Sequence, residues 1–264
     1  MSIFDQEHKD FLKEKNKLKI KITFFRCFIV VGFLIIWELL SRLKLINTFL
    51  FSSPSNIFMT LIKLIKNGEL FRHIGITMYE VLISFGIVGI LGIFIAFLLW
   101  KFPTISKIID PYLTILNSLP KVALGPLIII WVGASINSII FMALMISLFV
   151  TIINIYNSFV NTDNNYIILM KSFNAKDWAI FKKVIFPSNF KNIVSAMKVN
   201  ISMSLIGVIM GELLVSKEGI GYLIMYGSQV FNIDLVITGV FILGIISYIM
   251  YYFINKLELV FGNK

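Results

Sequence analysis

Three residues with unusual chemistry stand inside an otherwise apolar run of this 264-residue chain. The run from Leu119 to Gly133 contains Pro120, Lys121 and Pro126. Proline cannot donate a backbone hydrogen bond and tends to kink a helix, and a lysine ammonium among apolar residues needs water, a carboxylate or carbonyl groups. We therefore expect these three residues to face an interior cavity. In the alternative, Lys121 extends towards a lipid headgroup.

A second set of small and polar residues recurs at helical spacing further along the chain. Asn200, Ser204, Gly207 and Gly211 stand at offsets of four, seven and eleven residues, so they share one face of a helix. Such a stripe lines a translocation path or makes a close helix contact, and both alternatives stay open. The neighbouring carboxylate of Glu212 is expected to act as a gate or as the partner of a cation.

The motifs of nucleotide and metal chemistry are missing from the sequence. It contains no GxxxxGK[ST] loop, no HExxH and no paired cysteines. His8 and His73 fall outside the apolar stretches, and the single cysteine, Cys27, is expected to be a small core residue. We therefore expect no catalytic residue, no metal ligand and no cofactor bound by this chain.

The elements that must position these residues are long apolar helices. The chain is 58% hydrophobic and 14% charged, with a mean hydropathy of +0.90, which is too apolar for a soluble domain of this size. Unbroken apolar runs without alternation predict an all-α, polytopic membrane bundle. Six spans are expected: Ile22–Leu40, Tyr79–Trp100, Pro111–Val132, Ser138–Val160, Ile193–Val215 and Asp234–Ile254. In the second of them, Gly86, Gly89, Gly92 and Ala96 predict close helix packing.

The distribution of basic residues predicts the orientation. If both termini are cytoplasmic, fifteen lysines lie inside, against six basic residues outside. The net charge of +10 is therefore read as a topology signal and predicts no nucleic-acid partner. We expect residues 1–21 to be a cytoplasmic basic tail and residues 22–264 a single transmembrane domain, with its core at about residues 70–255.

Two stretches between the spans are amphipathic. Residues from Pro54 to Met78 carry apolar side chains at helical spacing, which predicts a helix on the outer surface. The cytoplasmic loop 161–192 places Trp178, Phe181 and Ile185 among charged and polar residues. A loop of this length is expected to be a docking element.

Three segments resemble the permeases of binding-protein-dependent ATP-binding cassette (ABC) importers, within them the nitrate, sulfonate and taurine type. The first is the run from Pro120 to Gly133, the second runs from Lys171 to Pro187, and the third from Gly211 to Ile224. Trp37 and Glu38 add to the match. The resemblance implies the type I importer fold, with a short coupling helix in loop 161–192 that sits in a groove of a separate ATPase.

The resemblance also implies site residues and partners. The ATPase-coupling residues would be Lys171, Asn174, Ala175, Asp177, Trp178, Phe181 and Pro187. Asn174 stands where the family has glycine, and it tolerates a left-handed turn. The family's Glu-Ala-Ala positions are occupied here by Ile168, Leu169 and Met170, so contacts that depend on that glutamate are lost. The docking face is expected to be formed by Trp178, Phe181 and Ile185.

The implied assembly contains a second copy of this chain, two ATPase subunits that carry ATP and Mg²⁺, and an extracytoplasmic binding protein. It would lie in the lipid bilayer of a bacterial cell membrane and import a nitrate-, sulfonate- or taurine-like anion or a vitamin precursor. The alternatives are a permease of the methionine or amino-acid type, an ion-gradient-driven carrier, an intramembrane enzyme and a structural scaffold.

Overall fold

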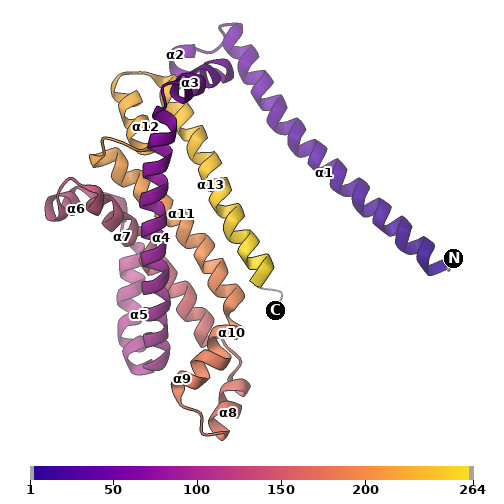
Figure 1. Cartoon of the computed structure of the whole chain (residues 1–264), viewed down its shortest axis with the longest axis vertical. Coiled ribbons are helices and arrows are strands. Elements are labelled where there is room, and N and C mark those ends of the chain that lie inside the picture. Colours follow the sequence, from indigo (N-terminus) through magenta and orange to yellow (C-terminus); the bar gives the residue numbers. More distant parts are fainter. Residues whose placement is uncertain (1–2, 262–264) are drawn as a thin grey trace.

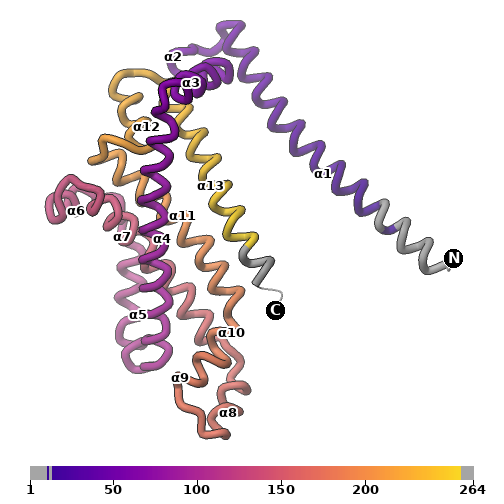
Figure 2. Tube along the Cα trace, in the orientation of Figure 1, coloured from indigo at the N-terminus to yellow at the C-terminus, as the bar shows by residue number. Residues whose placement is uncertain are grey.

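The computed structural model describes residues 3–261, and the side chains of residues 3–10, 12, 13 and 257–261 are outside the description (Figures 1 and 2). His8, Lys9, Lys13 and Lys264, which entered the sequence predictions, therefore lie outside the described side chains. Within residues 3–261 the regular structure is entirely helical. The predicted all-α class is confirmed.

Five helices are long and apolar enough to cross a membrane, and a bent pair adds a sixth span. The long helices are α1 (Ile3–Arg42), α4 (Glu69–Lys101), α7 (Ile136–Val160), α11 (Phe190–Val215) and α13 (Ile233–Phe261). The bent pair consists of α5 (Pro103–Ser118) and η1 (Lys121–Leu124) with α6 (Gly125–Val132). The predicted number of about six spans is confirmed.

The third span was predicted as Pro111–Val132 with prolines that tend to kink it, and the structure breaks it near Pro120. Its two halves meet at an angle of 82°. Leu119 is extended, with φ −62° and ψ 142°, and the ring of Pro120 disfavours helical geometry at this preceding residue. Pro111 lies inside α5, and Pro126 occupies the first turn of α6, where a missing N–H costs nothing. Only one of the two candidate prolines therefore stands at the break.

The predicted surface helix Pro54–Met78 is two elements. The amphipathic helix α3 (Pro54–Lys66) ends at Asn67 and Gly68, and Gly68 has a φ of +73° that favours glycine. Residues from Glu69 onwards belong to α4, so the second span starts ten residues before the predicted Tyr79. Ser53 caps α3 by accepting a hydrogen bond from the Asn56 amide at 3.2 Å.

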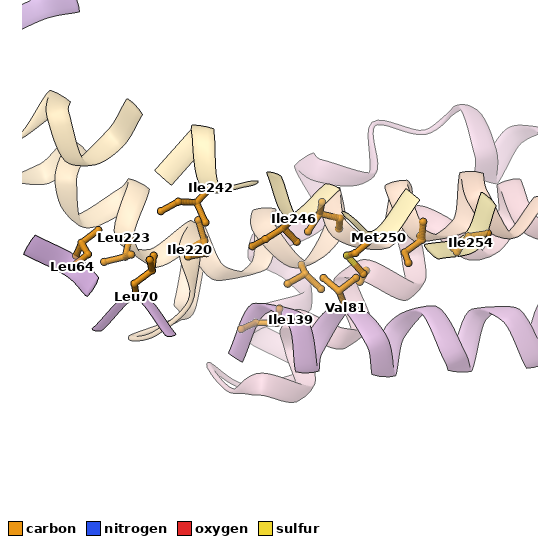
Figure 3. Packing of buried hydrophobic residues seen from close by; sticks show 14 of the residues in the cluster. Leu64, Leu70, Val81, Ile139, Ile220, Leu223, Ile242, Ile246, Met250 and Ile254 are labelled. Carbon is orange, nitrogen blue, oxygen red and sulfur yellow. The ribbon is translucent and has the colours of Figure 1, made fainter. Parts of the chain in front are cut away.

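The largest apolar core lies between α4, α7, α11 and α13 (Figure 3). Val81 of α4, Ile139 of α7 and Ile246 of α13 are almost fully buried there, and Ile220 joins them from the short helix α12 (Ile220–Gln229). Leu64 extends the cluster to α3. This core holds the helices that carry most of the predicted polar sites.

Helix α1 stands apart from this bundle (Figure 1). None of its most apolar 18-residue window is buried within the chain, and its main contact is with α3. Cys27 is therefore exposed, and the expectation of a core cysteine is wrong for the single chain. The sequence could not show this, because an apolar helix is equally suited to lipid or to protein neighbours.

The short elements gather at opposite ends of the molecule (Figure 1). α2 (Thr48–Phe51), α3 and α12 lie at one end. α8 (Asn164–Ser172), α9 (Asp177–Ile180), the π-helical turn η2 (Phe181–Ile185) and α10 (Phe186–Ser188) lie at the other. α1 ends and α13 begins at the α3 end of the molecule (Figure 2).

Candidate functional site

The loop between α7 and α11 is built around a tight turn. Asp163 starts α8 by accepting a hydrogen bond from the Asn165 amide at 2.9 Å. The helix ends where Asn174 adopts a φ of +56°. The Ala175 amide then donates to the carbonyl of Met170 at 3.1 Å. The predicted left-handed turn at Asn174 is confirmed, and it sends the chain back into α9.

One side of this loop is anchored in the bundle by aromatic rings. Phe181 is 7% exposed, and its ring centroid lies 4.4 Å from that of Phe97 on α4 and 5.4 Å from that of Phe159 on α7. Ile185 is fully buried in the same cluster. The expectation that Phe181 and Ile185 belong to a docking face is therefore wrong. Both fasten the loop to α4 and α7.

The other side of the loop exposes apolar side chains. Trp178 is 62% exposed, as expected of a docking residue, and Phe173 is 75% exposed. Ile168 and Leu169 on α8 are also exposed. We call Ile168, Leu169, Phe173 and Trp178 the exposed loop edge. Sequence reasoning missed Phe173, although an aromatic residue beside a lysine and an asparagine was the available signal.

The remaining predicted coupling residues surround this edge. Lys171, Asn174, Asp177 and Pro187 are exposed, and Ala175 is half-buried against the aromatic cluster. The loop thus combines an apolar edge with charged neighbours on a rigid support. Such a surface can dock against a protein partner.

Lys121 is buried at the break between α5 and η1. Its Nζ donates to Asn117 Oδ1 at 3.1 Å and to the carbonyl of Ile146 at 3.3 Å, and it lies 5.5 Å from the centroid of the Phe149 ring. The ammonium therefore points into the chain, as the interior interpretation required, and finds neutral oxygens. Its contact with a transported solute stays a prediction.

The polar stripe on α11 packs against α7 and α4. Asn200 Nδ2 donates to the carbonyl of Phe85 at 3.1 Å, and Ser204 Oγ donates to Ser147 Oγ at 3.3 Å. A Cβ added to Gly207 would collide with the Ala143 backbone, and one added to Gly211 would lie 2.9 Å from Ile139 Cα. The packing supports the helix-contact alternative for these residues, and a role in the path stays a prediction.

Glu212 fastens the start of α12. Its carboxylate accepts hydrogen bonds from the Thr77 hydroxyl at 2.6 Å and from the Gly221 amide. The adjacent amides of Gly219 and Ile220 donate to His73 Nδ1 and Thr77 Oγ1, both at 2.9 Å. No cation pairs with Glu212 among the described side chains. We call His73, Thr77 and Glu212 the α12 latch.

The latch corrects the placement of His73 and adds a residue. His73 was expected outside the spans, but it lies in α4 and is nine-tenths buried. Thr77 was missed, although His73, Thr77, Glu80 and Ser84 stand at offsets of four, seven and eleven residues, and this helical spacing of polar residues was the available signal. Gly219 has a φ of +104°, and a side chain at Gly219 or Gly221 would overlap the Glu212 carboxylate. Glycine is therefore required at position 219 by its positive φ, and at positions 219 and 221 by the close approach of the Glu212 side chain.

The described residues contain no group of three histidine, cysteine or acidic side chains placed to hold a metal ion.

Several known permeases are similar in sequence to this chain. An ABC transporter permease protein of Haemophilus influenzae is 28% identical over 239 residues, covering 90% of this chain and 96% of that protein. The aliphatic sulfonates transport permease SsuC of Bacillus subtilis is 27% identical, covering 84% of this chain and 81% of its own length. The formylaminopyrimidine transport permease ThiX of Halalkalibacterium halodurans is 26% identical, covering 85% and 89%.

A solved structure shows the same fold. The inward-facing methionine ABC transporter MetNI matches with a TM-score of 0.63 at 16% identity, covering 74% of this chain and 97% of the matched one. The model of the binding-protein-dependent transport system inner membrane component matches residues 89–258, which include the loop and, of the α12 latch, Glu212. This chain is therefore a multi-pass membrane protein that belongs to the binding-protein-dependent transport system inner membrane component family, the permeases of ABC importers.

Proposed function

We propose that this permease forms the translocation path of an importer for a small solute and that a separate ATPase subunit docks on the exposed loop edge. The observation that carries this proposal is the two-sided loop at the end of the bundle. Its inner side is fixed by Phe181 and Ile185, and its outer side presents Phe173 and Trp178. A rigidly anchored apolar edge transmits a partner's movement to α4 and α7, because packed elements shift as units.

The proposed complex contains two copies of this chain, two ATPase subunits and a binding protein that delivers the solute at the α12 end. ATP and Mg²⁺ would be held by the ATPase subunits. ATP binding would draw the two ATPases together, and the loops would carry this motion into the paired bundles. The transported solute would then meet a path that opens alternately to each side.

We propose that the end bearing α8–α10 faces the cytoplasm, together with both termini. The excess of lysines on that side supports this orientation. The chain's path supports it too, because six crossings return the C-terminus to the side of the N-terminus.

The solute class is proposed from the relatives. Their names include aliphatic sulfonates and formylaminopyrimidine, so a small organic anion and a pyrimidine-type vitamin precursor are the two candidates.

Affinity purification of the tagged protein from mild detergent, followed by partner identification and an ATPase assay, tests the proposal. We expect an ATPase subunit to co-purify with the native chain and to be lost from Phe173→Asp. The matched control is Phe58→Asp, which changes a 63% exposed phenylalanine on α3, at the other end of the bundle. A stable complex that contains no ATPase would contradict the proposal.

A further inference from the structure

Two buried polar groups on α4 lack a hydrogen-bond partner within the part of the chain that the structure describes. They are Glu80 Oε2 and Ser84 Oγ, on side chains of residues that are 1% and 0% exposed. Four residues separate them, so they share one face of the helix. Buried polar groups in folded proteins are nearly always bonded, and the requirement is stricter where lipid replaces water. These two groups therefore need hydrogen-bond partners that the described residues do not supply in this conformation.

Other buried hydroxyls in the same bundle are satisfied locally. Ser147 Oγ donates to the carbonyl of Ala143 at 2.6 Å, and Thr151 Oγ1 donates to the carbonyl of Ser147 at 2.8 Å. Both bonds run four residues back along α7, which is the usual solution for hydroxyls in a helix. Ser84 makes no such bond. Its hydroxyl stays available to a group from outside α4.

A polar cavity adjoins Glu80. It has a volume of about 450 Å³, which is within the range of small-molecule sites. Glu80 forms one wall, the connection Ala134–Ile136 before and at the start of α7 forms a second, and the connection Val215–Glu218 before α12 forms the third. The cavity thus lies where three elements meet next to the α12 latch.

The latch connects Glu80 to movements of α12. The Glu80 carboxyl lies beside that of Glu212, which in turn accepts a hydrogen bond from the Gly221 amide. A displacement of the first turn of α12 would break its bonds to His73, Thr77 and Glu212 together. The same displacement would free the Glu212 carboxylate beside Glu80, and Ser84 lies one helical turn further along the same face of α4.

We propose that Glu80 and Ser84 form a solute-binding site that opens when the start of α12 moves, and that it takes a small polar solute bearing N–H or O–H donors. A carboxylate oxygen accepts hydrogen bonds, and the Ser84 hydroxyl both donates and accepts them, so a solute that carries N–H donors together with an acceptor satisfies both groups. An alkyl sulfonate is an anion with acceptors alone, so it offers Glu80 no donor and would lie beside the carboxyl groups of Glu80 and Glu212. An aminopyrimidine carries N–H donors and fits it well. This inference rests on the proposed function and selects between its two solute classes.

Cysteine accessibility in the full complex tests the opening. Ser84→Cys would be made in a Cys27→Ala background and treated with a membrane-impermeant methanethiosulfonate, first without nucleotide and then with ATP and vanadate. We expect labelling to be about tenfold faster in the trapped state, because the rate follows the open population. Ser147→Cys, equally buried but inside the α7–α11 contact, is the matched control and should stay unlabelled. Equal rates at Ser84→Cys in the two states, or labelling of the control at the same rate, would overturn the proposal.

A second reporter, Glu80→Cys, tests the opening if Ser84→Cys fails to fold. Its labelling is also expected to be about tenfold faster in the trapped state. The solute class is tested on Ser84→Cys, which keeps the Glu80 carboxyl. Formylaminopyrimidine should slow labelling of the trapped complex about tenfold, and methanesulfonate should leave it unchanged, because occupancy by a bound solute blocks the thiol. Equal slowing by methanesulfonate, or no slowing by formylaminopyrimidine, would overturn the assignment of the ligand.

A reporter at the opposite end separates this inference from the proposed function. Ser172 is exposed next to the exposed loop edge, and Ser172→Cys, which keeps Phe173 and Trp178, should be shielded by a docked ATPase. If Ser172→Cys reacts equally with and without the co-purified partner, the proposed function fails. If Ser172→Cys is shielded while Ser84→Cys stays closed in both states, the importer assignment stands and the binding site at Glu80 is wrong.

Discussion

The two ends of this permease are held by different kinds of contact. At the α8–α10 end the loop is fastened by apolar side chains, with Phe181 among the rings of Phe97 and Phe159. At the α12 end Ile220 also packs in the apolar core, and the helix start is additionally fastened by directional hydrogen bonds to the latch, His73, Thr77 and Glu212.

The difference indicates which end is built to move as a unit and which is built to open. Apolar packing has no replacement partner in water, so a loop held in this way stays attached to its helices when it is displaced. Hydrogen bonds can be exchanged for bonds to water or solute, so a latch made of them opens at a smaller net cost. The loop end is therefore suited to transmit a partner's movement to the helices, and the α12 end is suited to open.

The strongest test of this comparison removes the apolar anchor. Phe181→Ala should lower the free energy of unfolding by about 3 to 5 kcal/mol, because it leaves a cavity among closely packed rings. Thermal unfolding of the purified protein in detergent measures the change. Phe173→Ala removes the same ring from an exposed position and should leave the melting temperature nearly unchanged while weakening ATPase binding. A melting temperature that falls equally in both variants would mean that the loop has no anchored side.

The next largest effect should come from the contact between α7 and α11, which connects the two ends. Gly207→Val places a side chain against the backbone of Ala143, and overpacking of this kind costs about 1 to 3 kcal/mol. Gly86→Val is the control, because no atom lies within 4 Å of the Cβ position there. Detergent unfolding should separate the two variants. Equal stability would show that α7 and α11 separate readily at this point.

The stripe on α11 also shows how far sequence reasoning extends. Helical spacing placed Asn200, Ser204, Gly207 and Gly211 on one face, and the structure keeps them there. The pattern could not say what that face meets, because small and hydroxyl residues suit a path and a helix contact equally. The choice depends on contacts with Ala143 and Ser147 of α7, which lie more than fifty positions from their partners in the sequence.

The loop and the latch also show which features a sequence can predict and which depend on tertiary contacts. The local turn at Asn174 was predictable, because few residues tolerate a positive φ. The inward direction of Phe181 was not, because a run of apolar and basic residues does not indicate which side of a loop meets the bundle. The latch joins α4 to α12 across more than 140 residues, and the helical spacing of His73 and Thr77 does not indicate that they meet the amides of Gly219 and Ile220. The break at Pro120 was visible as a proline, whereas its 82° angle depends on tertiary packing.

A smaller effect is expected from loosening the latch. Thr77→Val keeps the shape of the side chain but removes the oxygen that accepts from the Ile220 amide and the proton donated to Glu212. The loss of buried hydrogen bonds should cost about 1 to 3 kcal/mol. Hydrogen exchange at the start of α12, measured by mass spectrometry, should become faster. Thr104→Val, at an exposed position of α5, is the control and should leave that exchange unchanged. Unchanged exchange in Thr77→Val would mean that α12 is held by its apolar contacts.

The smallest effect concerns the turn that shapes the exposed loop edge. Asn174 holds a φ of +56°, a conformation that costs an alanine more than an asparagine and that glycine adopts freely. Asn174→Ala should therefore lower the melting temperature slightly, by the equivalent of about 1 kcal/mol or less, while Asn174→Gly should match or exceed the native protein. The turn at Asn174 sets the relative positions of Phe173 before it and Trp178 after it. Asn174→Ala should therefore also weaken ATPase binding more than Asn174→Gly does, as measured by co-purification. If the two variants bind the ATPase equally, the turn sets the stability of the loop but not the shape of its docking surface. Transmission of the ATPase's movement would then depend on the aromatic anchor alone.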